Sequence, residues 1–149
     1  MAEEMILSSS VEETEAAGRA LGKRIASEGH AYIALFGDLG VGKTAFTRGI
    51  VSELSPKARV HSPTYTIVND YSEKGAGYDV YHFDMYRITD EESLYSTGYF
   101  DYLTDRAFVI VEWCENIIDL LPSPRIEVCI EYAGEGKRKI TEKIICSED

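Results

Sequence analysis

A glycine-rich segment, residues 37–44, holds the residue types and spacing needed to bind a phosphate chain. It reads Gly-Asp-Leu-Gly-Val-Gly-Lys-Thr and matches G-x-x-x-x-G-K-[ST] at each fixed position. Glycines let backbone N–H groups turn toward phosphate oxygens, and a following helix presents its positive N-terminal end. Lys43 can reach the terminal phosphates and Thr44 can reach Mg²⁺. The pattern predicts nucleotide binding by Asp38, Leu39, Gly40, Val41, Gly42, Lys43, Thr44 and Ala45.

Two acidic residues at the ends of predicted strands could complete this site. Asp84 follows the mixed run 80–83, and Glu112 follows the apolar run 108–111. A carboxylate beside the metal could ligate Mg²⁺, hold a metal-bound water or orient the attacking water. Either acid could also be an ordinary surface residue, and the sequence does not divide the roles between them. Both are therefore candidates for catalysis and for metal binding, alongside catalytic Lys43 and metal-binding Thr44.

The nucleotide and the reaction class follow from weaker signals. A GTPase is expected to carry N-K-x-D for guanine and D-x-x-G for its switch, and neither occurs in this chain. Adenine is therefore favoured. Three classes remain open: an ATPase, a small-molecule kinase and a binding module switched by nucleotide. A kinase usually needs a lid and an acceptor pocket, for which 149 residues leave little room.

Hydrophobic periodicity and turn residues predict the elements that would position these side chains. A possible capping box, Ser10 with Glu13, begins the first helix. The predicted helices are 11–28, 43–54 and 90–97, and the predicted strands are 31–36, 64–71, 78–84, 107–111, 125–132 and 139–145. This order predicts an α/β fold of the P-loop NTPase type, with a mixed β-sheet flanked by helices and a C-terminal β-hairpin. We expect one domain over residues 1–149, and the strand order is not readable from the sequence.

The composition restricts partners and location. The chain has 15 basic and 26 acidic residues, a formal net charge of −11, which should repel a nucleic-acid backbone. The basic run 137–139 is interpreted as a solvated turn. The three cysteines lack metal-type spacing. With no basic, apolar start of a secretory signal and no apolar run of membrane-spanning length, we expect a cytoplasmic protein without a membrane partner.

Three further segments, in order after the glycine-rich loop, carry a family resemblance. They are His-Ser-Pro-Thr-Tyr-Thr-Ile-Val at 61–68, Tyr-His-Phe-Asp-Met-Tyr-Arg at 81–87 and Val-Glu-Trp at 111–113. Together they closely resemble the TsaE family, the ATPase component of bacterial threonylcarbamoyladenosine (t6A) synthesis on tRNA. The likeness runs from the first helix to about residue 132. It implies ATP and Mg²⁺ as cofactors, TsaD and TsaB as protein partners, and a tRNA substrate held mainly by other subunits.

The resemblance also assigns roles to single residues. Lys43 and Thr44 keep the roles given above. Asp84 matches the family's essential aspartate beside the metal and γ-phosphate, and Glu112 matches its Mg²⁺-associated glutamate. Trp113 matches an aromatic residue near the nucleotide. ATP hydrolysis at such a site is expected to support repeated turnover by the TsaD–TsaB complex.

The segments around these residues carry further expectations. Thr64 or Thr66, in the family's first switch, could sense the γ-phosphate, or could serve only the sheet. His82 is expected to be a hydrogen-bonded structural residue that faces away from the neighbours of Asp84. Cys114 stands where many family members have proline, which puts the path of the loop after Trp113 in doubt.

Overall fold

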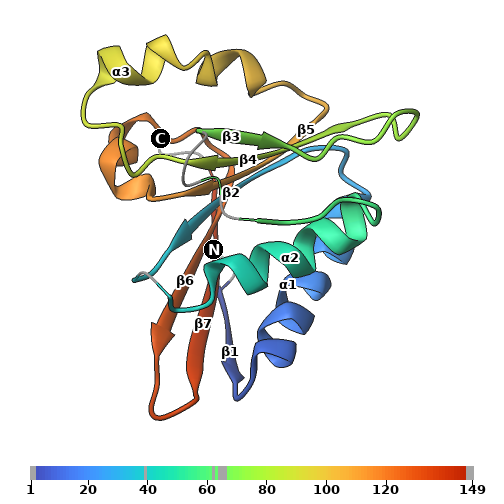
Figure 1. Cartoon of the computed structure of the whole chain (residues 1–149), viewed down its shortest axis with the longest axis vertical. Coiled ribbons are helices and arrows are strands. Elements are labelled where there is room, and N and C mark those ends of the chain that lie inside the picture. Colours follow the sequence, from blue (N-terminus) through green and yellow to red (C-terminus); the bar gives the residue numbers. More distant parts are fainter. Residues whose placement is uncertain (1–2, 39, 62, 64–66, 147–149) are drawn as a thin grey trace.

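The computed structural model describes residues 3–38, 40–61, 63 and 67–146, and it contains one seven-stranded sheet (Figure 1). The α-helices are α1 (Val11–Ala26), α2 (Lys43–Leu54) and α3 (Glu91–Ser96), and the 3-10 helices are η1 (Tyr99–Tyr102) and η2 (Cys114–Leu120). The strands are β1 (Glu3–Ser8), β2 (Ala31–Phe36), β3 (Val68–Asp70), β4 (Asp79–Asp84), β5 (Ala107–Glu112), β6 (Arg125–Tyr132) and β7 (Arg138–Ile145).

The sheet is mixed, as predicted. Its order is β1-β7-β6-β2-β5-β4-β3. Strand β2 pairs in parallel with β6 and β5, and β5 pairs in parallel with β4. The outer pairs β1–β7, β6–β7 and β3–β4 are antiparallel. The carboxyl ends of four parallel strands therefore lie at one edge of the sheet, the usual place for a ligand site in an α/β protein.

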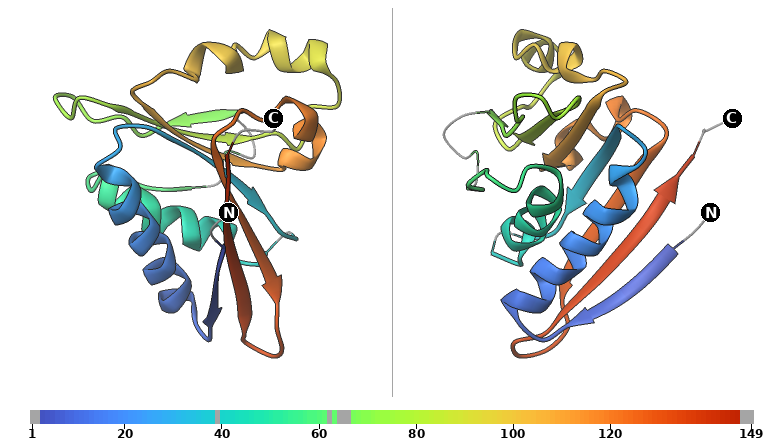
Figure 2. Two further views of the ribbon diagram at one scale, coloured as in Figure 1. Left: turned by 180° about the vertical axis from the view of Figure 1, so that it is seen from behind. Right: turned by 90° about the vertical axis from the view of Figure 1, so that its right-hand side faces the viewer.

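Helices cover both faces of the central strands. Side chains of β2 alternate, so that Ile33 and Leu35 enter one buried cluster while Tyr32 and Ala34 enter the other. The first cluster holds the apolar residues of α1 and α2, and the second holds those of α3 and η1. Figure 2 shows these two groups of helices on opposite sides of the sheet. Burial on both faces explains the continuous apolar run of β2.

Helices α1 and α2 lie side by side (Figure 1), and two glycines permit their close approach. A Cβ atom at Gly18 would lie 2.0 Å from the carbonyl oxygen of Phe46, and one at Gly49 would lie 2.0 Å from that of Glu15. Neither position tolerates a side chain without separating the helices. The contact fixes α2, and with it the residues at its first turn.

Most predicted elements are confirmed within a few residues. The first helix ends at Ala26, and Ser10 caps it as predicted, since its Oγ accepts from the N–H of Glu13 at 3.1 Å. The returning bond differs from a standard capping box, because Glu13 Oε1 accepts from the N–H of Ser9, the residue before the N-cap, at 2.8 Å. In the described part of segment 64–71, only Val68–Asp70 is strand.

Strand β1 was not predicted. Most of its residues are exposed, so the sequence lacks the buried alternation of a strand. Among the described residues, β7 is the only strand that pairs with β1. In the described part of the chain, no helix has the length and apolar character needed to cross a membrane.

Candidate functional site

The glycine-rich loop joins the carboxyl end of β2 to α2. Gly37 and Gly42 have φ angles of 150° and 124°, in the region that favours glycine. A Cβ at Gly37 would lie 2.6 Å from the carbonyl oxygen of Ile130 on β6, so the loop backbone packs directly on that strand. Gly42 is the N-cap of α2 and has no side chain to cap it. The N–H groups at the start of α2 therefore face the loop, where an anion would be stabilised. Leu39 lies outside the described residues.

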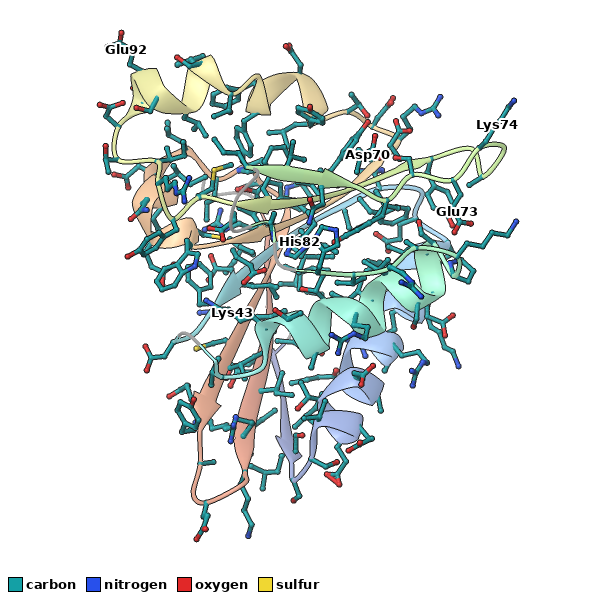
Figure 3. All side chains as sticks on the ribbon, in the orientation of Figure 1. Lys43, Asp70, Glu73, Lys74, His82 and Glu92 are labelled. Atoms are coloured by element: carbon teal, nitrogen blue, oxygen red, sulfur yellow. The ribbon has the colours of Figure 1, made fainter. Side chains whose placement is uncertain are left out.

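Lys43 is the first residue of α2, and its side chain folds back over the loop (Figure 3). It is 5% exposed. Its Nζ donates to the carbonyl oxygen of Gly37 at 2.7 Å and lies 4.2 Å from the centre of the Trp113 ring. Among the described residues, Lys43 forms no ion pair with a carboxylate. Its positive charge therefore remains available to an anion in the loop.

Asp84 and Glu112 lie side by side at the same edge of the sheet. Glu112 is paired with Leu35 of β2 and with Asp84 of β4, so one row of the sheet leads from the start of the loop to both acids. The Oδ1 atom of Asp84 accepts from the N–H of Tyr86 at 2.8 Å. This register brings the predicted acids to the loop, where phosphate and metal would meet.

The electrostatics of Asp84 suit a proton acceptor. Burial raises the pKa of the Asp84 carboxyl, the hydrogen bond from Tyr86 opposes the rise, and the charge of Glu112 adds to it. The charges of His82 and Lys43 lower the pKa of Asp84, and their effects are smaller than these three. A raised pKa means that the Asp84 carboxylate binds a proton more readily than an exposed aspartate does.

His82 does not face away from the acids, and that expectation was wrong. Its Nε2 lies 2.6 Å from Oε2 of Glu112, and the side chain is fully buried. Residues two apart on a strand share a face, so His82 lies on the same face as Asp84 and diagonally across from Glu112. The histidine is hydrogen-bonded, as predicted, but its partner is a candidate metal ligand. Such a contact fixes which oxygen of Glu112 faces the site.

A second polar cluster joins Asn69 of β3 and Tyr71 to His61, the residue before the predicted switch segment. Tyr71 donates its hydroxyl to the carbonyl oxygen of His61 at 3.0 Å and accepts from the N–H of His61 at 3.2 Å. Asn69 donates to the same carbonyl at 3.0 Å. The Tyr71 ring lies 6.1 Å from the ring of His82. Contacts therefore connect His61 to the Glu112 side of the site, while Thr64 and Thr66 lie outside the described residues.

Trp113 follows Glu112 directly and closes one side of the loop. It has φ of 59°, in the left-handed region, and its ring lies 5.0 Å from that of Tyr86. The next residue, Cys114, is buried, and its Sγ donates to the carbonyl oxygen of Val111 at 3.0 Å. The cysteine thus turns into the core where η2 begins, which defines the loop path that the sequence left in doubt. An aromatic side chain over Lys43 is in place to contact a bound nucleotide.

The remaining predicted residues occupy different positions around the loop. Thr44 is half-buried in the first turn of α2, Ala45 is buried, and Asp38 is exposed. Hydroxyl and carboxylate oxygens are ligands that Mg²⁺ accepts, usually one or two carboxylates with phosphate and water. No cluster of three or more His, Cys, Asp or Glu residues suited to a metal exists among the described residues. The donor set fits Mg²⁺ bound together with phosphate.

Arg138 is a site residue that the sequence analysis missed. The run 137–139 was interpreted as a solvated turn, but the Arg138 Nε donates to the carbonyl oxygen of Val41 in the loop at 2.7 Å. The two residues are 97 positions apart in the sequence, so no local sequence pattern predicts their contact. Lys137 and Lys139 are exposed, as predicted, but only Lys137 lies in the turn, since β7 begins at Arg138. The prediction of a solvated turn is therefore wrong for Arg138 and Lys139.

A glycine-rich loop between a buried parallel strand and a helix, with acids at the ends of neighbouring strands, defines a P-loop nucleotide-binding protein. The family model described as "Threonylcarbamoyl adenosine biosynthesis protein TsaE" matches residues 8–140. The chain therefore belongs to the TsaE family.

Individual relatives agree with this assignment. Three proteins named tRNA threonylcarbamoyladenosine biosynthesis protein TsaE are similar to the chain. The Haemophilus influenzae protein is 41% identical over 69% of this chain and 64% of its own length. The Bacillus subtilis protein is 38% identical over 73% and 66%, and the Rickettsia felis protein 33% over 90% and 76%. The matched region thus spans just under two thirds of the first two relatives. The crystal structure of Bacillus subtilis YdiB is similar with a TM-score of 0.74 and 28% identity, covering 97% of this chain and 86% of YdiB.

Proposed function

We propose that this chain binds ATP with Mg²⁺ and hydrolyses it as a subunit of the machinery that forms t6A on tRNA. One observation carries the proposal. The Lys43 ammonium, without an ion-pair partner among the described residues, lies over the glycine-rich loop at the edge of the sheet where Asp84 and Glu112 end neighbouring strands. A cation available to phosphate and two carboxylates in one row are the groups that phosphoryl transfer to water requires.

The loop and α2 would hold the phosphates. Backbone N–H groups around Gly42 and the positive end of α2 attract the anion. Lys43 would exchange its contact with the Gly37 carbonyl for the β- and γ-phosphates, a charge-assisted interaction that is stronger than the neutral one it replaces. Trp113 lies beside this position and would contact the nucleotide.

Thr44 and Glu112 would ligate Mg²⁺ together with the phosphates, and Asp84 would contact the ion through a metal-bound water. Their hydroxyl and carboxylate oxygens are the hard ligands that this ion accepts. When bound, the ion neutralises charge on the terminal phosphates. His82 fixes Oε2 of Glu112 through the 2.6 Å contact, so the orientation of this carboxylate is set before nucleotide arrives.

Asp84 is the residue that we assign to the attacking water. Its partly buried carboxylate has a raised pKa and lies beside Glu112, so it can accept a hydrogen bond, and then the proton, from water at the γ-phosphate. Lys43 stabilises the charge on the phosphate oxygens.

The role in the complex follows from family membership and charge. We propose TsaD and TsaB as the partners whose turnover the hydrolysis supports, in the cytoplasm. A net charge of −11 opposes direct binding of a tRNA backbone, so the other subunits would hold most of the tRNA. Partner contact is also expected to raise the hydrolysis rate, because added positive charge at the γ-phosphate is a common way to accelerate this reaction.

ATP hydrolysis at fixed Mg²⁺, with the chain alone and then with TsaB and TsaD, tests the proposal. We expect slow turnover alone, stimulation by the partners, and loss of both in Lys43→Ala. Lys74→Ala is the matched control, because this exposed lysine lies in the β3–β4 turn, far from Lys43 (Figure 3). Absence of stimulation would contradict the proposed role in the complex. Transfer of phosphate to a metabolite without any effect of partners would favour a small-molecule kinase instead.

A further inference from the structure

Arg138 ties the C-terminal hairpin to the glycine-rich loop. Its Nε donates to the Val41 carbonyl at 2.7 Å, and its Nη1 donates to the Lys137 carbonyl at 3.0 Å. The guanidinium carbon lies 4.3 Å from the centre of the Tyr132 ring on the opposite strand of the hairpin. Two hydrogen bonds and a stacked ring fix the plane of the guanidinium.

The hairpin supports the loop at more than this point. The loop backbone packs on β6 at Gly37, where a Cβ would lie 2.6 Å from the Ile130 carbonyl oxygen. A Cβ at Gly40 would lie 3.8 Å from the Tyr132 hydroxyl. The contact of Arg138 with Val41 completes a row along the loop. The hairpin is therefore the surface on which the loop rests.

The contact between Arg138 and Val41 fixes the orientation of the peptide group that joins Val41 to Gly42. A trans peptide is planar, and its C=O and N–H point in opposite directions. Because the Val41 carbonyl points toward Arg138 on the hairpin, the N–H of Gly42 points away from the hairpin. Gly42 has φ of 124°, a backbone conformation that glycine can adopt but that no side chain of its own holds in place. Contacts from other residues must therefore fix it.

We infer that Arg138 is a positioning residue that holds the Val41–Gly42 peptide with the Gly42 N–H turned toward the phosphates of the bound nucleotide. The inference rests on the proposed nucleotide site and adds a part of the chain to it. Without the guanidinium, the peptide can rotate and present a carbonyl oxygen to the anion, which repels it. Arginine suits this role because its flat fork serves two carbonyls and one ring at once, whereas an ammonium is a single point of charge.

Replacement of the donor tests the inference. Arg138→Met keeps a long apolar stem and removes the hydrogen bonds. We expect the dissociation constant for ATP with Mg²⁺, followed by the fluorescence of the single tryptophan, Trp113, to rise about tenfold. The KM for ATP should rise in parallel, with kcat within about twofold of the unchanged protein, because the N–H binds phosphate equally before and during reaction.

Two matched variants separate geometry from charge and from folding. Lys137→Met removes the same charge from the neighbouring exposed position and should leave ATP affinity unchanged. Arg138→Lys keeps the charge without the fork and should still bind several-fold more weakly. Wild-type affinity in Arg138→Met or in Arg138→Lys, or an equal loss in Lys137→Met, would overturn the inference. A loss of kcat at unchanged KM would also overturn it, since it indicates a smaller folded fraction. Failure of the unchanged protein to bind ATP would instead contradict the proposed function.

Discussion

The two ends of the central strand β2 differ in the kind of concavity that they carry. At the carboxyl end, Lys43, Asp84 and Glu112 lie beside the glycine-rich loop. At the amino end, a cavity of about 670 Å³ opens between α1, the start of β6 and the segment before β5. Its walls are largely apolar, and its charged groups include Arg24, Arg125 and Glu142. This cavity thus lies at the end of β2 without the glycine-rich loop.

Charge pairing explains why the carboxyl end of β2 is the better nucleotide site. At the amino end, Arg24 contacts Glu142 and lies 3.6 Å from Glu4, and Arg125 donates to Glu127 at 2.8 Å. These cations are neutralised by carboxylates. Lys43 contacts only a carbonyl oxygen and an aromatic ring among the described residues, so it attracts an anion without first losing an ion pair. A cavity whose cations are already paired is therefore a weaker phosphate site than a glycine-rich loop beside an unpaired lysine.

The largest difference between the two ends should appear in turnover. Asp84→Asn keeps the shape of the side chain and removes its ability to take a proton, so kcat for ATP hydrolysis should fall by about a hundredfold or more. ATP affinity should change much less. Glu142→Gln makes the same chemical change at the amino end and should leave kcat unchanged. Steady-state kinetics of both variants check the comparison, and equal effects would break it.

Nucleotide affinity should show the next largest contrast. Lys43→Met removes a charge-assisted contact worth about 1.5–3 kcal/mol, so ATP should bind tenfold to a hundredfold more weakly. Arg24→Met removes a cation of the amino-end cavity and should leave affinity unaltered. Calorimetric titration with ATP and Mg²⁺ measures both. Weaker binding in the Arg24 variant than in the Lys43 variant would reverse the assignment of the two ends.

The Mg²⁺ requirement sharpens the comparison between two histidines. His82→Phe removes the partner that orients Glu112, so half-maximal hydrolysis should need about tenfold more Mg²⁺. His30→Phe alters an exposed histidine beside the amino-end cavity and should change nothing. The measurement is turnover against Mg²⁺ concentration at saturating ATP. An unchanged Mg²⁺ requirement in His82→Phe would limit that residue to packing.

The smallest expected effect is on stability. Arg24→Ala leaves Glu142 buried without its counter-ion; since Arg24 is half-exposed, we expect a loss of about 1–2 kcal/mol in the free energy of unfolding at pH 7. Burial raises the pKa of Glu142, and Arg24 opposes the rise. The deficit should therefore shrink as pH falls through this raised pKa, because a protonated Glu142 needs no counter-ion. Denaturation at several pH values measures it, and a deficit that grows toward acid would contradict this account.

The fold was largely predictable because its signals are local. The buried run of β2, the N-cap at Ser10 and the glycines of the C-terminal hairpin each specify an element within a short window. Strand β1 was not predictable in this way, because it is held by pairing with β7 rather than by its own buried face. The strand order likewise depends on contacts between distant segments.

The residues of the candidate site also divide into those that local sequence predicts and those that depend on contacts between distant segments. The loop, Asp84 and Glu112 stand in recognisable sequence positions, and the order of the strands brings them together. The contacts of His82 with Glu112 and of Arg138 with Val41 arise only when separate strands meet. Side chains that orient the site, rather than those that form it, are therefore the part that the sequence leaves open.

The most direct test is a crystal structure of the chain with Mg²⁺ and a non-hydrolysable ATP analogue. We expect the β- and γ-phosphates within hydrogen-bond distance of the Gly42 and Lys43 N–H groups, with the Lys43 ammonium moved from the Gly37 carbonyl to phosphate. The metal should lie between the phosphates, Thr44 and the acids Asp84 and Glu112. A triphosphate bound instead in the amino-end cavity, with Lys43 still on the Gly37 carbonyl, would contradict the account.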